Sequence, residues 1–130
     1  LKQLGNNHVL VVSADDGLDE ISIAAATKVA ELKDGEITEY TIKPEDFGFD
    51  GQALSDITVE NADQSLEMLK GVLSNTAGPA RDIVALNAGA AIYAANLTET
   101  LEGGIKRAVE VIESGLALNK LTALIEKTAA

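Results

Sequence analysis

The order of apolar and polar positions predicts strands in the first third of this chain and helices in the remainder. Residues 9–12 form a continuous apolar run, Val-Leu-Val-Val, which is typical of a strand buried on both faces. Such a strand needs neighbouring strands on either side, and the rest of the chain supplies few candidates. Since the chain also begins at Leu1 rather than Met, we expect it to be the carboxyl-terminal portion of a longer protein.

Residues 21–32 are compatible with two structures. Their apolar residues recur at nearly helical spacing, and their alanines favour a helix. Against this, Asp34-Gly35 is a strong signal for a two-residue hairpin turn, and the residues that follow it alternate in a manner that suits a strand. We therefore predict a β-hairpin with strands over residues 27–33 and 36–42.

Residues 44–57 are rich in proline, glycine, aspartate and phenylalanine, which indicates a loop rather than a regular element. Within this loop we expect Phe47 to pack as the anchor of a turn. The chain as a whole is thus predicted to be an α/β protein, in which a buried strand and a hairpin are followed by several helices.

Amphipathic helices are predicted for the remainder of the chain. Asn61 is suited to cap the first of them, a second runs over about residues 82–96, and Ser114-Gly115 separates the last two. The apolar positions expected on successive helices are Leu66, Leu69 and Leu73; Val84, Ala88, Ala91, Ile92 and Ala95; Ile105, Ala108, Val109 and Ile112; and Leu118, Leu121, Leu124 and Ile125. Because residues 88–91 are all small, another element must approach the second helix closely.

The composition narrows the class of protein. A length of 130 residues suffices for one domain with a real core. The chain has no cysteine, which excludes disulfide bonds and thiolate metal ligands. It has neither an apolar run of about twenty residues nor a charged leader, so we predict no membrane span, no signal peptide and a cytoplasmic location. The net charge of −11 repels phosphate backbones, so we expect no nucleic-acid partner.

An acidic segment follows the first predicted strand directly. Asp15, Asp16, Asp19 and Glu20 lie within six residues and flank Gly17. Ligands of open α/β sheets bind at the carboxyl ends of the strands, and carboxylate oxygens suit a hard divalent cation. The acids alone are equally compatible with a solvated turn that binds nothing.

The order of residues within this segment is more specific than its acidity. Residues 16–20, Asp-Gly-Leu-Asp-Glu, match without a gap the metal-binding signature of the anthranilate phosphoribosyltransferases. Matching segments then follow in order along the chain: Leu4-Gly5, the hairpin pattern over 29–40, P-E-D-F-G at 44–48, E-N-A at 60–62, N-A-G-A-A at 87–91, E-G at 102–103 and I-E-S-G at 112–115. The chain therefore resembles this family over its whole length.

The resemblance implies a fold and an activity. It implies that residues 1–130 are a partial domain, the carboxyl-terminal portion of the α/β domain of the nucleoside phosphorylase/phosphoribosyltransferase fold. The family transfers the phosphoribosyl group of phosphoribosyl pyrophosphate to anthranilate in tryptophan biosynthesis, releases diphosphate, and is homodimeric. The helical domain of the family, its G-T-G-G-D phosphate loop and its K-H-G-N segment have no counterpart in these residues. We therefore expect the chain alone to be inactive.

The resemblance also assigns the metal. It implies that Asp19 and Glu20 bind Mg²⁺, and that this segment supplies no catalytic base or nucleophile. Magnesium is usually held by one or two carboxylates together with substrate phosphates, which these two acids can provide. Asp16 is expected to brace the turn through hydrogen bonds, while Asp15 occupies a variable position of the motif.

Two further polar residues have structural interpretations. His8, the only histidine, is predicted to be exposed and non-catalytic, since nothing in the sequence gives it a partner. Asn87 lies among apolar positions and is predicted to be a satisfied amide that bridges its helix to a loop. Two other functions remain open, a non-catalytic acidic metal-binding module and a relative of the pyrimidine nucleoside phosphorylases, although the Asp-Gly-Leu-Asp-Glu segment argues against the latter.

Overall fold

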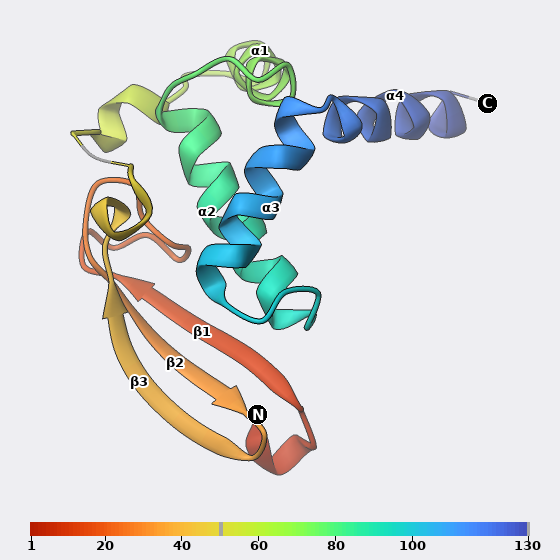
Figure 1. Cartoon of the computed structure of the whole chain (residues 1–130). Helices are drawn as coiled ribbons and strands as arrows, with labels where there is room; N and C mark the ends of the chain where they lie inside the picture. The colour runs from red at the N-terminus through yellow and green to blue at the C-terminus, as the bar shows by residue number, and fades with distance from the viewer. Residues whose placement is uncertain (50, 130) are drawn as a thin grey trace.

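The computed structural model describes residues 1–49 and 51–129, and within them a three-stranded antiparallel sheet precedes four α-helices (Figure 1). The α/β class predicted from the sequence is therefore confirmed. The elements, in chain order, are η1 (Lys2–Leu4), β1 (His8–Ala14), β2 (Thr27–Lys33), β3 (Glu36–Ile42), η2 (Pro44–Phe47), η3 (Leu54–Ile57), α1 (Ala62–Leu73), α2 (Pro79–Ala94), α3 (Leu101–Glu113) and α4 (Leu116–Thr128).

The predicted hairpin is present with its predicted bounds. Asp34 and Gly35 both have positive φ, 50° and 79°, as a two-residue turn between right-handed twisted strands requires. Lys33 pairs with Glu36 across this turn, and the register continues to Thr27 opposite Ile42. The helical alternative for residues 21–32 is therefore wrong.

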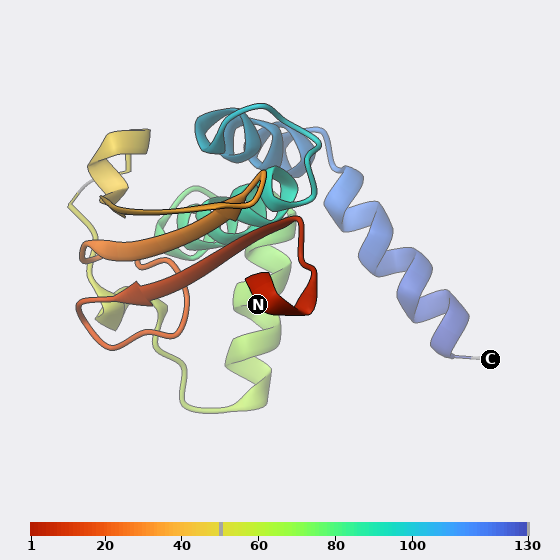
Figure 2. The same cartoon turned by 90° about the horizontal axis from the view of Figure 1, so that it is seen from below.

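Strand β1 is not buried on both faces, which corrects the first prediction. It pairs with β2 and lies at an edge of the sheet, whose order is β1-β2-β3. The helices pack against one face of the sheet (Figure 2). Val12 contacts the core on this face, whereas Val11, which points to the opposite face, is 51% exposed. A continuous apolar run thus does not by itself specify double burial.

Helices α2 and α3 pack closely through small residues, as the sequence indicated. A side chain added at Gly89 would overlap the backbone of Ile105, and one added at Gly104 would overlap the carbonyl oxygen of Gly89. Only glycine permits the two backbones to approach so closely. The core then forms between these helices and the sheet, with Leu86 fully buried.

The buried faces of α1 and α2 differ from the predicted ones. On α1, Leu66 and Leu69 are 45% and 44% exposed, and Val72 is the buried residue. The core residues of α2 are Ile83, Leu86, Ala90 and Tyr93, whereas the predicted face contains the exposed Val84, Ala91 and Ala95. Apolar residues surround most of α2, so their spacing could not identify the side that meets the sheet.

The connecting segments are partly as predicted. Residues 44–57 contain the short helices η2 and η3 in addition to loop, and Phe47 packs against the core as expected. Residue 50 of this predicted loop lies outside the described residues. The break before α4 is confirmed by the positive φ of 77° at Gly115.

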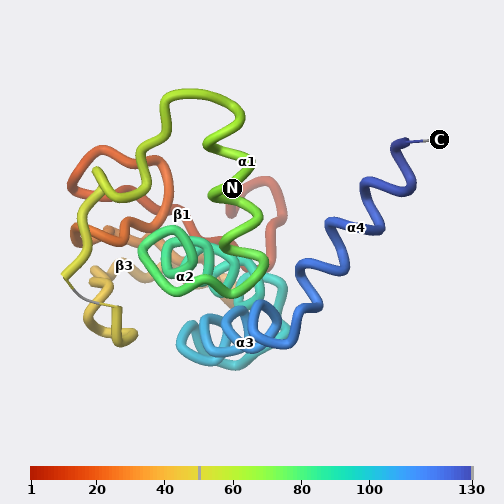
Figure 3. Tube along the Cα trace, turned by 90° about the horizontal axis from the view of Figure 1, so that it is seen from above, coloured from red at the N-terminus to blue at the C-terminus, as the bar shows by residue number. Residues whose placement is uncertain are grey.

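Helix α4 extends away from the rest of the chain (Figures 1 and 3). Its Leu124 and Ile125 are 58% and 56% exposed, so the apolar face predicted for this helix is largely uncovered. Within residues 1–49 and 51–129, no helix has both the length and the apolar character needed to cross a membrane.

Candidate metal site

The acidic segment lies in the loop that connects the end of β1 to the start of β2. Backbone hydrogen bonds shape its first turn: the Gly17 N–H donates to the Ala14 carbonyl at 3.1 Å, and the Ala14 N–H donates to the Leu18 carbonyl at 3.3 Å. Gly17 has a φ of 91°, which favours glycine at this position. The end of the loop returns to β1 through a bond from the Asp15 N–H to the Ala26 carbonyl.

Asp16 braces this turn, as predicted. Its Oδ1 accepts a hydrogen bond from the Leu18 N–H at 3.2 Å, and its Oδ2 accepts one from the buried Ser22 hydroxyl at 2.5 Å. The Ser22 oxygen in turn accepts from the N–H groups of Ala24 and Ala25. Both carboxylate oxygens of Asp16 thus accept hydrogen bonds from within the loop.

Asn87 of α2 binds the same loop from the other side, and the predicted bridge is confirmed. Its Oδ1 accepts from the Ile21 N–H at 2.9 Å, and its Nδ2 donates to the Ile21 carbonyl at 2.9 Å. The Nδ2 also donates to the Ile83 carbonyl at 3.0 Å, within the same helix. One amide thus satisfies both backbone groups of Ile21.

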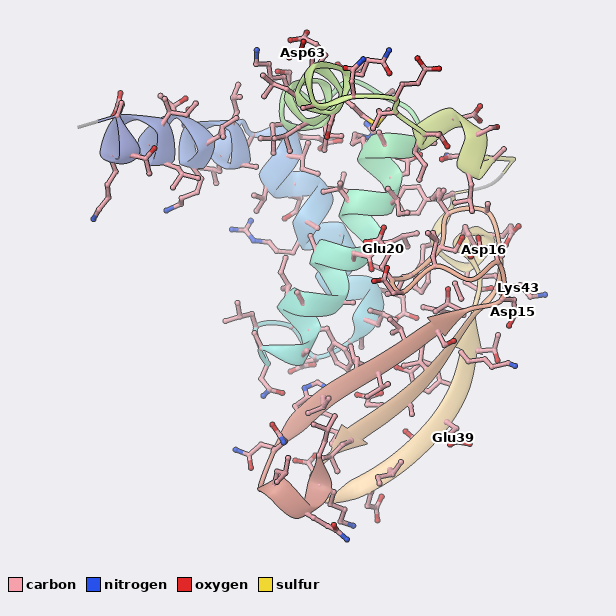
Figure 4. All side chains as sticks on the ribbon, turned by 180° about the vertical axis from the view of Figure 1, so that it is seen from behind. Asp15, Asp16, Glu20, Glu39, Lys43 and Asp63 are labelled. Carbon is pink, nitrogen blue, oxygen red and sulfur yellow. The ribbon has the colours of Figure 1, made fainter. Side chains whose placement is uncertain are left out.

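Asp19 and Glu20 lie between these two fixed points and are both exposed. Glu20 extends towards α2, whereas Asp15 and Asp16 lie on the other side of the loop (Figure 4). Partial burial raises the pKa of Glu20, and the neighbouring Asp19 carboxylate raises it further. A cation at this position would relieve the repulsion between the two acids.

These two residues fit one kind of magnesium site and not another. In the part of the chain that the structure describes, no three His, Cys, Asp or Glu side chains gather closely enough to enclose a metal. A closed protein cage is therefore not formed by these residues. Two adjacent carboxylates do fit an ion that takes its other ligands from phosphate oxygens and water, which is the usual environment of Mg²⁺.

Asp15 takes no part in this pair. Its carboxylate lies 3.8 Å from the Lys28 ammonium group on β2, and both side chains are well exposed. An ion pair of this kind contributes little to stability. The structure thus separates Asp15 from the two acids that the family motif assigns to the metal.

The prediction that His8 is exposed is wrong, because its side chain is only 3% exposed. Its Nε2 lies 2.9 Å from Oε1 of the buried Glu31, and its Nδ1 lies 2.8 Å from Oδ1 of Asn96. The hydroxyl groups of Tyr93 and Tyr40 also donate to Glu31, at 2.6 and 3.0 Å. Sequence reasoning missed this cluster because its members are far apart in the chain.

The Glu31 cluster belongs to the structure of the sheet and not to the acidic loop. His8 pairs with Lys33 at one end of the sheet, and the loop leaves β1 at the other end. Glu31, with its hydrogen-bond partners, joins β1, β2, β3 and α2 by polar contacts inside the core.

Residues 1–118 match the model of the glycosyl transferase family, a/b domain. An anthranilate phosphoribosyltransferase from Methylococcus capsulatus is 64% identical to the chain over 124 residues, which cover 95% of this chain and 36% of that protein. The chain therefore spans little more than a third of the length of this relative.

Solved structures of anthranilate phosphoribosyltransferases also resemble this chain. An anthranilate phosphoribosyltransferase from Thermus thermophilus superimposes with a TM-score of 0.87 and 31% identity, over 99% of this chain and 38% of that one. A variant of the enzyme from Saccharomyces cerevisiae with Mg bound gives a TM-score of 0.78 and 26% identity, over 92% and 35% of the two chains. The resemblance found in the sequence is confirmed, and this chain belongs to the glycosyl transferase family whose a/b domain it matches.

Proposed function

We propose that this chain is part of an anthranilate phosphoribosyltransferase. The whole protein would transfer the phosphoribosyl group of phosphoribosyl pyrophosphate to anthranilate, giving N-(5-phosphoribosyl)anthranilate and diphosphate in tryptophan biosynthesis. The main support is the 64% identity to a relative of that name, which extends over almost the whole chain. The pyrimidine nucleoside phosphorylases and a non-catalytic acidic module have no comparable support.

Residues 1–130 would form part of the α/β domain in this enzyme. The helical domain and the first part of the α/β domain, with the contacts to the substrate phosphates and to anthranilate, would come from residues outside this chain. We further propose that the whole protein is a homodimer, as the resemblance implies, and that it is cytoplasmic, as predicted from the sequence.

Asp19 and Glu20 are the residues that we propose as Mg²⁺ ligands. When bound, the ion would neutralise the charge that develops on the departing diphosphate. An acidic loop in a chain of net charge −11 would otherwise repel that diphosphate. The two carboxylates act here as ligands and not as bases, and the fixed loop contributes mainly to the positioning of the substrate.

Substitution of the two acids in the protein at its natural length tests this role. Asp19→Asn and Glu20→Gln should each raise the Mg²⁺ concentration needed for half-maximal rate and lower turnover. An amide of the same shape cannot replace a carboxylate bound to a cation. The loss should be about 2–4 kcal/mol of transition-state stabilisation, by analogy with the loss of one preorganised electrostatic contact. Initial rates over a Mg²⁺ titration measure both quantities.

Asp15→Asn is the matched control, because it changes an acid of the same loop that faces Lys28. This variant should keep the magnesium dependence of the unsubstituted protein. All three variants should unfold at nearly unchanged denaturant concentration, since exposed loop acids contribute little to stability. If Asp15→Asn were as damaging as the other two changes, the assignment of ligands within the loop would be wrong. If all three variants kept the magnesium dependence of the unsubstituted protein, the loop would be a solvated turn that binds no metal.

A further inference from the structure

We propose that Asn87 is a positioning residue for the metal ligands, which it controls through the backbone of Ile21. This inference rests on the proposed function in so far as Glu20, the residue before Ile21, binds the metal. The hydrogen bonds between Asn87 and Ile21, on which the inference is based, are features of the structure and do not depend on that function.

The amide of Asn87 has one orientation that satisfies its surroundings. Its oxygen faces the Ile21 N–H, and its nitrogen faces the carbonyl groups of Ile21 and Ile83. A rotation of the amide by half a turn would place donor against donor and acceptor against acceptor. The bond to Ile83, one helical turn earlier, therefore fixes the direction in which the amide presents itself to the loop.

The helix that carries Asn87 is itself held firmly at this point. Leu86 is completely buried, and Gly89 lies against the backbone of Gly104 and Ile105 on α3. Asn87 thus lies between two of the most tightly packed positions of α2. Because α2 is held rigidly at this point, the Asn87 side chain can hold the acidic loop in place with little movement of its own.

The loop is fixed at the other end by Asp16. Its carboxylate holds the Leu18 N–H and the Ser22 hydroxyl. Leu18 before the acidic pair and Ile21 after it are therefore both hydrogen-bonded to defined partners, and the pair is confined between them. Residues that hydrogen-bond to metal ligands and orient them commonly change metal affinity by about 10- to 100-fold when they are substituted. Asn87 acts on Glu20 through the adjoining backbone of Ile21, and we expect an effect of the same size.

Metal affinity and amide exchange test this role in the protein at its natural length. Asn87→Leu keeps the size of the side chain but removes its three hydrogen bonds, and Asn87→Ala removes the same bonds with a smaller side chain. The affinity for Mn²⁺, used as a paramagnetic probe in the presence of inorganic diphosphate, should fall by about 10- to 100-fold in both variants. Exchange of the Ile21 amide proton should become faster, while the amides of α3 keep their protection.

Ile112→Ala is the matched control, because it weakens the packing of α3 at a buried position outside the core cluster that contains Ile21 and Ile83. It should lower the unfolding temperature and leave Mn²⁺ affinity and Ile21 exchange unchanged. Unchanged Mn²⁺ affinity in Asn87→Leu, or an equal loss in Ile112→Ala, would overturn the positioning role. If the unsubstituted protein bound no Mn²⁺ through Asp19 and Glu20, the proposed function would fail instead, and Ile21 exchange would still decide whether Asn87 holds the loop.

Discussion

At the scale of single residues, two acids of this chain have pKa values shifted in opposite directions. Partial burial acts to raise the pKa of both carboxyl groups. For Glu20, the negative charge of the neighbouring Asp19 raises the pKa further. For Glu31, hydrogen bonds from Tyr93, His8 and Tyr40 outweigh the effect of burial and lower the pKa. Both causes disfavour the charged form of Glu20, which a bound cation would favour, whereas hydrogen bonds within the fold stabilise the charged form of Glu31.

Glu31→Gln should destabilise the protein at neutral pH by about 1–3 kcal/mol, because a buried carboxylate that accepts several hydrogen bonds is replaced by an amide with only one acceptor. Since the folded pKa of Glu31 lies below its ordinary value of 4.5, its contribution is complete above pH 4.5 and is lost as pH falls through the folded pKa. Urea unfolding of both proteins at neutral and acidic pH measures this difference.

Tyr40→Phe provides the control for this prediction, because it removes one donor and leaves those of Tyr93 and His8 in place. Its loss of stability should be smaller than that of Glu31→Gln. A stability difference between unsubstituted protein and Glu31→Gln that persisted unchanged into acid would contradict the assigned role of the Glu31 charge.

The polar residues also show which roles of single residues can be predicted from the sequence and which cannot. The roles of Asp16 and Asn87 could be anticipated, because one is local and the other belongs to a recognisable family segment. The burial of His8 could not, since its partners Glu31 and Asn96 are 23 and 88 residues away. No pattern near His8 distinguishes a buried histidine from an exposed one.

At the scale of elements, the hairpin could be predicted from local residues, whereas the buried faces of the helices depend on tertiary contacts. Asp34-Gly35 determines the conformation of its own turn, so the bounds of β2 and β3 could be predicted from the residues themselves. The buried side of α2 depends instead on the position of the sheet and of α3. In a helix with apolar residues on most sides, spacing alone cannot supply that information.

Substitution of a helical glycine by alanine should have opposite effects on stability at the contact between α2 and α3 and away from it. Gly89→Ala and Gly104→Ala should each lower the free energy of unfolding by about 1–3 kcal/mol, because the added methyl group would force two helix backbones apart. Gly71→Ala on α1 is the control, since its added Cβ would lie 3.8 Å from Thr76, an ordinary contact. It should raise stability by about 0.4–1 kcal/mol through the lower entropy of the unfolded chain.

Denaturant unfolding of the three glycine variants gives these differences directly. A neutral effect of Gly89→Ala would mean that α2 and α3 can separate without loss, contrary to the close packing of their backbones. A destabilising effect of Gly71→Ala would show that helix α1 needs glycine for a reason other than space.

At the scale of the whole molecule, this chain leaves several apolar surfaces uncovered. Val11 and Ile37 are more than half exposed on the outer face of the sheet, and Leu124 and Ile125 are similarly exposed on α4. Within the described residues, β1 pairs with β2 alone and its other edge has no strand beside it. Open strand edges and apolar patches of this kind promote association with other chains.

The chain of residues 1–130 by itself should therefore self-associate and show no transferase turnover. Association follows from the exposed edge of β1, and inactivity from the lack of the G-T-G-G-D and K-H-G-N segments that the family resemblance connects with substrate binding. Light scattering coupled to size-exclusion chromatography, together with an assay on chain free of host enzyme, measures both properties. Val11→Lys is the informative variant, because a charge on an edge strand opposes pairing and should shift the chain towards monomer. A stable monomer of the unsubstituted chain at all concentrations would contradict the first expectation, and measurable turnover would contradict the second.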